Sequence, residues 1–287
     1  MSRIAYVNGS YVRHAEAGVS IEDRGYQFAD GVYEVCEVYQ GALVDEPRHM
    51  ARLAYSLGEL RIDAPMAPKA LLMVMREVVA RNKVSYGYVY VQVTRGVAKR
   101  DHYFPNPAVR PAIVITAKAM NPKKGAANAA KGIAVVSLPD IRWKRPDIKT
   151  IGLLPNVLAR QAAREDGAYE AWLVDDKGFV TEGAATNAWI VDSAGTLISR
   201  QADHSILRGI TRTTLLDLVA RENLRFEERA FTLDEAYAAT EAFITGATTL
   251  VMPVVQIDGR TIGTGTPGPM ATRLRAAFHS VAAMDKS

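Results

Sequence analysis

The stretch DIKTIGLLPNVLA, residues 147–159, places a lysine immediately before a run of apolar residues that leads into a helix. We expect its apolar neighbours to keep water away from the amine of Lys149; these are Ile148, Ile151, Leu153 and Leu154. Removal of water lowers the pKa of a lysine, and a neutral amine can act as a nucleophile or a base. Most lysines instead lay their stem along apolar surface and keep the charged end in water. This stretch alone therefore leaves both interpretations open.

The composition of the chain is that of an ordinary globular protein. Of its 287 residues 48% are hydrophobic and 23% are charged, with a formal net charge of +4. The length suits about two domains. Acidic and basic residues are interspersed, so the small positive excess suits a small anionic ligand as well as a polyanion. The composition gives no argument for nucleic acid as a partner.

Cysteine and histidine usage argues against disulfides and metal. Cys36 is the single cysteine, so no disulfide can form within the chain, and the five histidines are scattered without metal-ligand spacing. The N-terminus shows no signal-peptide pattern, and no stretch approaches the roughly 18 apolar residues of a membrane span. We expect a cytoplasmic protein without a membrane segment or a metal site.

The first half of the chain predicts an α+β unit with a mostly antiparallel sheet. IAYVNGSYVRH, residues 4–14, reads as a hairpin around an Asn-Gly turn, and residues 32–44 read as a second hairpin around Gln-Gly. Apolar residues at helical spacing predict helices at about 46–62 and 67–82. YVYVQVTRG and RPAIVITAK then return to strand pattern.

The second half predicts a separate, larger domain. Residues 121–131 are small and polar and are expected to link domains 1–120 and 132–287. Helices are predicted at 154–166, 211–222 and 268–284, with short strands between them. The fold class is therefore mixed α/β (α+β), and two such domains predict a ligand cleft between them.

Two turns in the second half are candidate anion sites. Gly209 precedes a helix whose first turn carries Ile210 and Thr211, where free N–H groups and the helix dipole favour an anion the size of phosphate. FITGATTLV, residues 243–251, runs from a strand into a small-residue turn that contains Thr248. A plain capping role explains Thr211 equally well.

Two further motifs carry charges suited to a ligand. VTEGAATN, residues 180–187, holds Glu182, which if buried would suit a protonated heterocycle. Arg100 and His102 follow a strand and could converge on one carboxylate. Solvated charge is the simpler interpretation of each motif. RWKRPDIK, residues 142–149, could be called a basic patch for nucleic acid, but it lacks interleaved aromatic residues beyond Trp143.

Taken together, these motifs resemble the fold type IV pyridoxal-phosphate aminotransferases. The motifs occur in the same order as in that family and cover nearly the whole chain. Within the family, the chain most resembles the D-amino-acid aminotransferases. The motifs are EDRGYQFADGVYEV (22–35), R-x-H (100–102), DIKTIGLLPNVLA (147–159), VTEGAATN (180–187) and ILRGITR (206–212). It implies a two-domain enzyme with its active site between the domains.

The resemblance also implies roles for individual residues. Lys149 would form the Schiff base with pyridoxal phosphate, and Glu182 would pair with the pyridinium nitrogen. The remaining cofactor contacts would come from Arg52, Leu207, Ile210, Thr211, Ala247 and Thr248. The substrate carboxylate would be bound by Tyr33, Arg100 and His102, with Tyr90 beside them. Family members usually carry a hydroxyl residue in place of Ala247, which puts that one contact in question.

The implied reaction is ping-pong transamination between a D-amino acid, such as D-alanine, and a 2-oxo acid, such as 2-oxoglutarate, in which Lys149 moves the α-proton. In the family the Arg-x-His pair reaches the neighbouring subunit's site, which implies a homodimer. Alternatives on the same fold are branched-chain L-aminotransferase, (R)-selective amine transaminase and 4-amino-4-deoxychorismate lyase. A noncatalytic metabolite binder is a rival of another class, against which Lys149 and Glu182 both argue.

Overall fold

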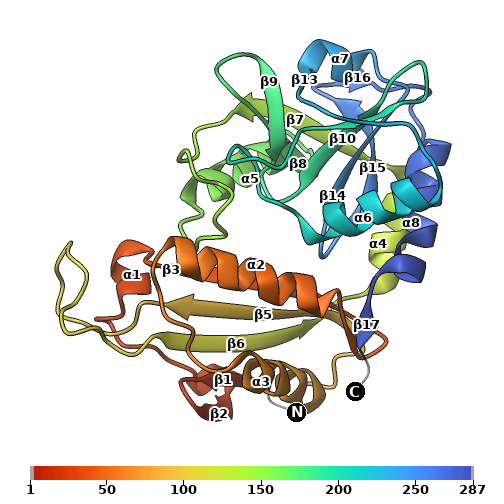
Figure 1. Ribbon diagram of the computed structural model, residues 1–287. Helices are drawn as coiled ribbons and strands as arrows, with labels where there is room; N and C mark the ends of the chain where they lie inside the picture. The colour runs from red at the N-terminus through yellow and green to blue at the C-terminus, as the bar shows by residue number, and fades with distance from the viewer. Residues whose placement is uncertain (1–2, 286–287) are drawn as a thin grey trace. The chain divides into compact units, whose positions relative to one another are not determined.

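The structure is a computed structural model that describes residues 3–285 of the chain. The chain forms two compact units (Figure 1). Unit 1 takes in the chain up to Asn121, the segment Ile148–Gly152 and the chain from Ala283 onward. Unit 2 comprises Pro122–Asp147 and Leu153–Ala282. Across the described residues, no helix combines the length and apolar character needed to cross a membrane.

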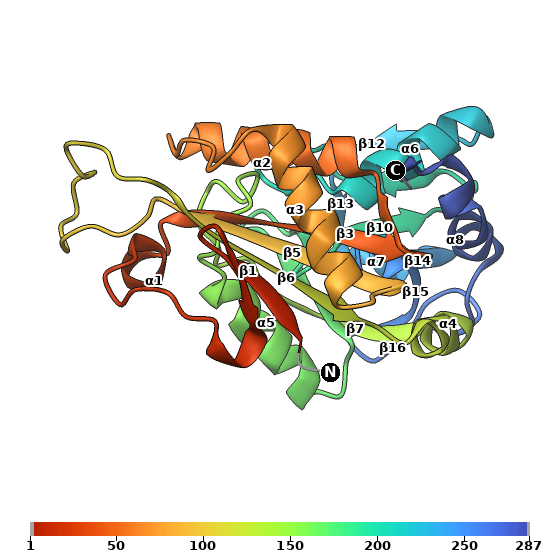
Figure 2. The same ribbon diagram turned by 90° about the horizontal axis from the view of Figure 1, so that it is seen from below.

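Unit 1 is built on one antiparallel sheet with the strand order β17-β4-β3-β5-β6-β1-β2. Its strands are β1 (Ile4–Val7), β2 (Ser10–Arg13), β3 (Gly31–Tyr39), β4 (Ala42–Val44), β5 (Tyr86–Thr94), β6 (Ala112–Ala119) and β17 (Met284–Asp285). Its helices are the 3-10 helix η1 (His14–Glu16), α1 (Arg24–Phe28), α2 (Glu46–Glu59) and α3 (Pro68–Arg81). Figure 2 shows α3 crossing the strands of this sheet.

The core of unit 1 lies on one face of that sheet. Strand β3 alternates strictly, with Val32, Glu34, Cys36 and Val38 buried and the residues between them partly exposed. The apolar stripes of α2 and α3 pack on the buried face, where Leu53, Leu57 and Met75 meet the strands. Because strand side chains alternate between faces, the opposite face is left free for other chemistry.

The segment Ile148–Gly152 extends the sheet of unit 1 next to the start of β3. Thr150 forms a β-bridge with Val32, and the N–H of Tyr33 donates to the carbonyl of Lys149 at 2.9 Å. The N–H of Lys149 in turn donates to the hydroxyl of Ser56 on α2 at 3.2 Å. These main-chain bonds fix the backbone that carries Lys149.

Unit 2 contains a larger mixed sheet with the order β12-β11-β10-β14-β15-β7-β8-β9-β13, and β16 pairs with β15. Its strands are β7 (Ile133–Pro139), β8 (Glu170–Val174), β9 (Phe179–Gly183), β10 (Asn187–Val191), β11 (Leu197–Ser199), β12 (Phe226–Glu228), β13 (Phe231–Thr232), β14 (Glu241–Gly246), β15 (Leu250–Ile257) and β16 (Arg260–Thr261). Its helices are α4 (Pro122–Lys131), α5 (Leu154–Glu165), α6 (Ile210–Arg221), α7 (Leu233–Tyr237) and α8 (Pro269–Val281).

The central strands of unit 2 are buried on both faces. Every residue of β10 is buried, as expected for a strand covered on each side. Trp189 and Phe243 stack on one face and pack with α6 and α8, while Ile190 and Ile244 belong to the core of the other face. This rigid centre carries the turns described below.

Several predictions from local pattern are confirmed. Both hairpins form, with left-handed residues at Asn8-Gly9 and Gln40-Gly41, and the predicted helices begin and end within a few residues of α2, α3, α5, α6 and α8. The division into domains 1–120 and 132–287 stays a prediction. The segment 121–131, predicted to link the domains, contains α4, because its alanines and lysines favour a helix that begins at Pro122.

Candidate active site

Lys149 stands on the face of the unit 1 sheet that is opposite to the core. Its Nζ lies 4.3 Å from the ring centre of Tyr33, which belongs to the outward set of β3 side chains. Tyr90 of β5 stacks on Tyr33 with 5.6 Å between ring centres. An ammonium over an aromatic face gains about 0.5–2 kcal/mol, more as water is excluded. Three of the predicted site residues of unit 1, namely Lys149, Tyr33 and Tyr90, are therefore brought together through the ring of Tyr33.

The surroundings of Lys149 differ from the sequence-based expectation. Of its apolar neighbours only Ile148 is buried, and Leu154 is 68% exposed. Lys149 itself is half-buried. The ring of Tyr33, which is stacked on Tyr90, lies against the amine in place of a shell of aliphatic side chains, because the bridge at Thr150 turns this segment along the strand.

Tyr90 is a poor acid in this place. Burial, with a smaller contribution from Tyr33, raises its pKa to about 12. Its hydroxyl donates to the side-chain carbonyl of Gln92 at 2.7 Å. Tyr90 therefore stays a neutral hydrogen-bonding group beside Tyr33 at ordinary pH.

Arg52 lies on the core side of the same sheet, where it pairs with Glu34. Its Nε and Nη2 donate to the two carboxylate oxygens of Glu34 at 3.0 and 2.5 Å, and His49 Nδ1 lies 2.8 Å from the same carboxylate. Burial opposes the charge of Glu34, yet Arg52 and His49 hold the pKa of Glu34 well below its usual range. This cluster fixes the orientation of the Arg52 guanidinium, and its role as a phosphate ligand stays a prediction.

Arg100 and His102 lie in the long connection between β5 and β6, and both are exposed. They contact the same aromatic ring: the Arg100 guanidinium carbon is 4.5 Å from the ring centre of Phe28, and the His102 ring is 5.5 Å from it. The structure thus places the two predicted carboxylate ligands side by side on one support.

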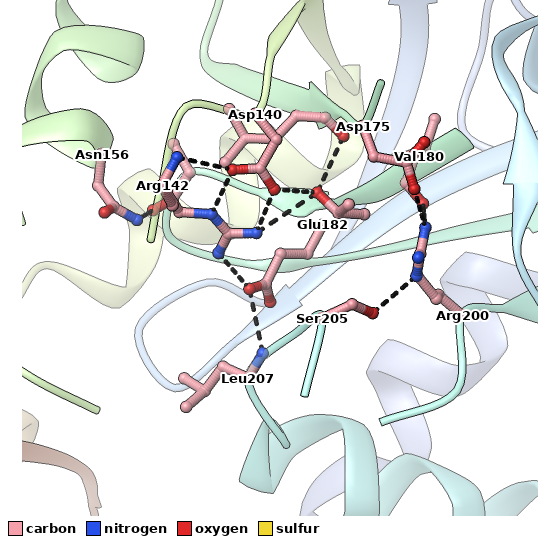
Figure 3. A network of polar contacts seen from close by, with 12 residues as sticks. Asp140, Arg142, Asn156, Asp175, Val180, Glu182, Arg200, Ser205 and Leu207 are labelled. Carbon is pink, nitrogen blue, oxygen red and sulfur yellow. Dashed lines mark hydrogen bonds and ion pairs between the residues drawn. The ribbon is translucent and has the colours of Figure 1, made fainter. Parts of the chain in front are cut away.

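Glu182 of β9 occupies the centre of a polar network in unit 2 (Figure 3). Its side chain is buried, and the carboxylate accepts hydrogen bonds at Oε1 from Arg142 (2.5 Å) and from the N–H of Leu207 (3.1 Å). Its Oε2 accepts one hydrogen bond from Asn187 Nδ2 at 2.8 Å. A carboxylate oxygen offers two acceptor positions, so Oε2 has capacity for another donor.

Arg142 links Glu182 to a second carboxylate, as Figure 3 shows. Its Nε and Nη2 donate to both oxygens of Asp140, at 2.9 and 2.7 Å, and Thr181 donates to the same carboxylate. Burial raises the pKa of Glu182, and the charge of Arg142 opposes that rise. Burial also disfavours charge on Asp140, but the hydrogen bonds from Arg142 hold the pKa of Asp140 below its usual value.

The start of α6 lies against this network. Gly209 supplies no capping side chain, which leaves the first N–H groups of α6, including those of Ile210 and Thr211, for another acceptor. A side chain at Gly209 would meet Asn187, since a Cβ there would lie 2.0 Å from Asn187 Oδ1. Leu207, just before this turn, both donates to Glu182 and accepts from Asn187.

The turn Gly246–Thr249 between β14 and β15 packs on the short connection between β9 and β10, residues 184–186. A Cβ at Gly246 would lie 3.3 Å from Thr186 and 3.5 Å from the carbonyl of Ala185, and the N–H of Thr249 closes the turn onto Gly246 at 3.1 Å. The two candidate anion turns therefore both border residues 185–187: Gly209 meets Asn187, and Gly246 meets Ala185 and Thr186. Thr248 is exposed on this turn, and Ala247 is half-buried beside it.

Unit 2 thus combines three features near residues 185–187. These are the buried carboxylate of Glu182 with spare acceptor capacity, the uncapped N-terminus of α6 and the small-residue turn Gly246–Thr249. A ring that carries a proton on nitrogen and an anionic group on another arm would find complementary partners here. Unit 1 supplies an amine held over an aromatic pair. Among the described residues, no cluster of histidine, cysteine and acidic side chains could hold a metal ion.

Comparison with known proteins agrees with this chemistry. Residues 31–257 match the family model of amino-transferase class IV. The chain belongs to the aminotransferase class IV family. Among relatives of this class, D-alanine aminotransferase of Bacillus licheniformis is 40% identical over 95% of each chain, and that of Staphylococcus aureus strain N315 is 38% identical over 95% of each chain.

Solved structures of branched-chain amino acid aminotransferases have the same fold. A branched-chain amino acid aminotransferase from T.th. with pyridoxamine 5'-phosphate aligns with a TM-score of 0.89 at 27% identity, over 98% of this chain and 94% of that one. The branched-chain enzyme of Escherichia coli aligns with a TM-score of 0.87 at 24% identity, over 98% and 94% of the two chains, which shows the fold alone.

The sequence did not single out Arg142 and Asn187 of this network, nor Glu34 of the Arg52 cluster in unit 1. Arg142 lies in the stretch that could be called a basic patch, yet its side chain is buried between Asp140 and Glu182. Asn187 ends the motif VTEGAATN, whose letters do not show that its side chain donates to Glu182. Glu34 could have been found, because the alternation of β3 places a charge at an inward position between Val32 and Cys36, and a buried charge needs a partner.

Proposed function

We propose that this class IV aminotransferase uses pyridoxal phosphate to transfer the amino group of a D-amino acid, such as D-alanine, to a 2-oxo acid, such as 2-oxoglutarate. The observation that carries the proposal is the set of D-alanine aminotransferases that are 35–40% identical over about 95% of the chain. It is supported by Glu182, whose Oε2 has acceptor capacity for a protonated ring nitrogen.

The residues present fit this cofactor. Glu182 would hold the ring nitrogen, and Leu207 would lie against the ring. The N–H groups at Ile210 and Thr211, with Arg52 and the turn at Ala247 and Thr248, would hold the phosphate. Because the N-cap residue Gly209 has no side chain to cap α6, the N–H groups of the first turn and the helix dipole would both stabilise an anion bound there. Ala247 lacks a hydroxyl, so its contact is limited to the main chain.

When bound, pyridoxal phosphate supplies an electron sink for the substrate α-carbon. Lys149 would hold the cofactor, and its Nζ would take the α-proton of the substrate as a base and later give a proton back. Glu182 would stabilise positive charge on the ring nitrogen, and the charge of Arg142 opposes the rise that burial causes in the pKa of Glu182. The ring of Tyr33, stacked on Tyr90, holds the amine of Lys149 over its face.

Arg100 and His102 would bind the substrate carboxylate together with Tyr33. A planar guanidinium can hold both carboxylate oxygens, and a histidine beside it adds a third donor. We propose that they do so in the neighbouring subunit of a homodimer, which is what the family resemblance of the R-x-H motif implies. The enzyme then works in two half-reactions on one site, which predicts ping-pong kinetics.

Transamination of branched-chain L-amino acids is a second candidate. The T.th. branched-chain enzyme shares the fold at 27% identity, which favours this candidate less than the D-alanine aminotransferases favour the first.

Parallel assays of D-alanine, L-alanine and L-leucine with 2-oxoglutarate separate the two candidates. We expect pyruvate from D-alanine only. Turnover of L-leucine without turnover of D-alanine would refute the proposed substrate. Assay of aminodeoxychorismate without an amino acceptor tests for a lyase.

Borohydride reduction of the purified protein followed by peptide mapping tests the cofactor. We expect a pyridoxyl group on Lys149. A Lys149→Ala variant that folds like the wild type should lose nearly all turnover, and undiminished transamination in that variant would contradict the mechanism.

A further inference from the structure

The connection of residues 95–111 between β5 and β6, here called the 95–111 loop, carries Arg100 and His102. It has no helix or strand of its own beyond a single bridge between Val97 and Asp23, and most of its residues are exposed. Figures 1 and 2 show it extending from the sheet beside α1. A loop of this kind needs anchors if two of its side chains are to bind one small carboxylate.

Arg24 provides such an anchor. It is the first residue of α1 and only 4% exposed. Its Nη1 donates to the carbonyl of Asp101 at 2.6 Å and to the carbonyl of Tyr103 at 3.2 Å. These two carbonyls flank His102, so one guanidinium holds the backbone on both sides of a predicted carboxylate ligand.

The same guanidinium supports Arg100 through Phe28. The guanidinium carbon of Arg24 lies 4.8 Å from the ring centre of Phe28, and that of Arg100 lies 4.5 Å from it. His102 contacts the same ring. Phe28 is thus shared by Arg24, which is buried, and by the two exposed residues of the loop.

Arg24 is itself fixed to the sheet. The Nε of Arg24 donates to Asp30 at 2.8 Å, and Asp30 also pairs with Arg95. The guanidinium carbon of Arg95 lies 3.6 Å from the ring centre of Phe104, which belongs to the loop. Burial opposes the charge of Asp30, yet Arg95 and Arg24 hold its pKa below the usual value. Gly25 lets α1 approach β5 closely, since a Cβ there would lie 2.2 Å from Thr94. The anchor therefore stands on rigid structure.

We propose that Arg24 is a positioning residue that sets the substrate carboxylate site by holding the 95–111 loop at the carbonyls of Asp101 and Tyr103. It acts through Arg100 and His102 and does not itself touch the substrate. The inference rests on the proposed function, in which those two residues bind the carboxylate.

An Arg24→Lys variant separates this role from a general ion pair. A lysine can keep the charge next to Asp30, but its single nitrogen cannot also reach two carbonyls and lie flat on Phe28. Arg81→Lys is the matched control, because Arg81 likewise stacks on an aromatic ring, Tyr11, and pairs with a carboxylate, Glu77, in the same unit.

Steady-state kinetics of the holoenzyme with D-alanine and 2-oxoglutarate test the proposal. We expect Arg24→Lys to raise KM for both substrates at least about tenfold, with kcat changed no more than about threefold, while Arg81→Lys keeps wild-type KM. Hydrogen exchange of residues 99–107 should be faster in Arg24→Lys and unchanged in the control. Wild-type KM in an Arg24→Lys protein would overturn the proposal.

A double-mutant cycle with Arg100→Ala shows whether Arg24 acts through the loop. Arg24→Lys should add less than about twofold to KM in the Arg100→Ala background, because the group that it positions is already gone. Fully additive effects would mean that Arg24 acts elsewhere.

If the wild type transaminates and Arg100→Ala raises KM but Arg24→Lys does not, the inference fails alone. If the wild type does not transaminate D-amino acids, the proposed function fails.

Discussion

Arg142 and Glu182 form a buried ion pair with 2.5 Å between Nη1 and Oε1. Burial raises the pKa of Glu182, and the adjacent guanidinium opposes that rise. Because Asp140 holds the other edge of the guanidinium, the arginine cannot turn away from Glu182 without leaving both carboxylates unpaired. The three residues therefore form one network. The pKa of Glu182 depends on Arg142, and Asp140 fixes the position of Arg142.

Arg142→Met should destabilise the protein by roughly 3–5 kcal/mol, because it leaves Glu182 and Asp140 buried without their partner. The measurement is urea unfolding of the apoprotein. Arg229→Met removes a half-exposed arginine that also contacts two carboxylates, and it should cost no more than about 1 kcal/mol. Equal losses in the two variants would contradict the importance of the buried pair.

Glu182→Gln should keep the fold and the covalently held cofactor but lose turnover by about 10²–10³-fold. The amide has nearly the same shape, yet it cannot stabilise positive charge on a ring nitrogen as a carboxylate does. The cofactor content is read from the visible absorption of the purified variant, and kcat is read with D-alanine and 2-oxoglutarate. A variant with full cofactor content and wild-type kcat would exclude the role proposed for Glu182.

The stability of unit 1 should fall in acid because of Glu34. Its pKa in the folded protein lies below the unfolded value of about 4.3, so the stabilisation is present above that pH and is lost as the pH falls toward the folded value. Glu34→Gln should lower the urea midpoint at about pH 6 and show a smaller further drop at about pH 3 than the wild type.

The exposed pair of Glu77 with Arg81 supplies the control for that experiment. Glu77→Gln should leave both the midpoint at about pH 6 and the acid-induced drop close to those of the wild type. Part of the drop should remain in Glu34→Gln, because the pKa values of Asp30 and Asp140 are also lowered. An identical drop in Glu34→Gln and the wild type would refute the prediction.

Local pattern was sufficient for the hairpins and helices because their signals lie within a few residues. The Asn8-Gly9 turn and the apolar stripe of α2 are of this kind. The network around Glu182 was not predictable in the same way, since Asp140, Arg142 and Asn187 come together only through strand pairing in unit 2. The pairing of Lys149 with Tyr33 likewise requires a segment from the middle of the chain to join the sheet of unit 1.

Gly209→Ala should weaken binding of pyridoxal phosphate to the apoprotein by at least about tenfold. Gly209 has an ordinary negative φ of −62°, so the added methyl strains no backbone angle; it meets Asn187 Oδ1 at 2.0 Å instead. Asn187 cannot yield freely, because its amide donates to Glu182 at 2.8 Å and to the carbonyl of Leu207 at 3.0 Å. The methyl group therefore displaces the support of Glu182 and the start of α6 together.

Fluorescence titration of the apoprotein with pyridoxal phosphate measures this effect without relying on turnover. Gly125→Ala is the matched control in unit 2, because its nearest neighbour would be the end of Arg275 at 3.8 Å and alanine favours the helix α4. That control should bind the cofactor like the wild type and unfold at an equal or slightly higher urea concentration. Equal cofactor affinity in Gly209→Ala and Gly125→Ala would show that Asn187 does not couple the α6 N-terminus to Glu182.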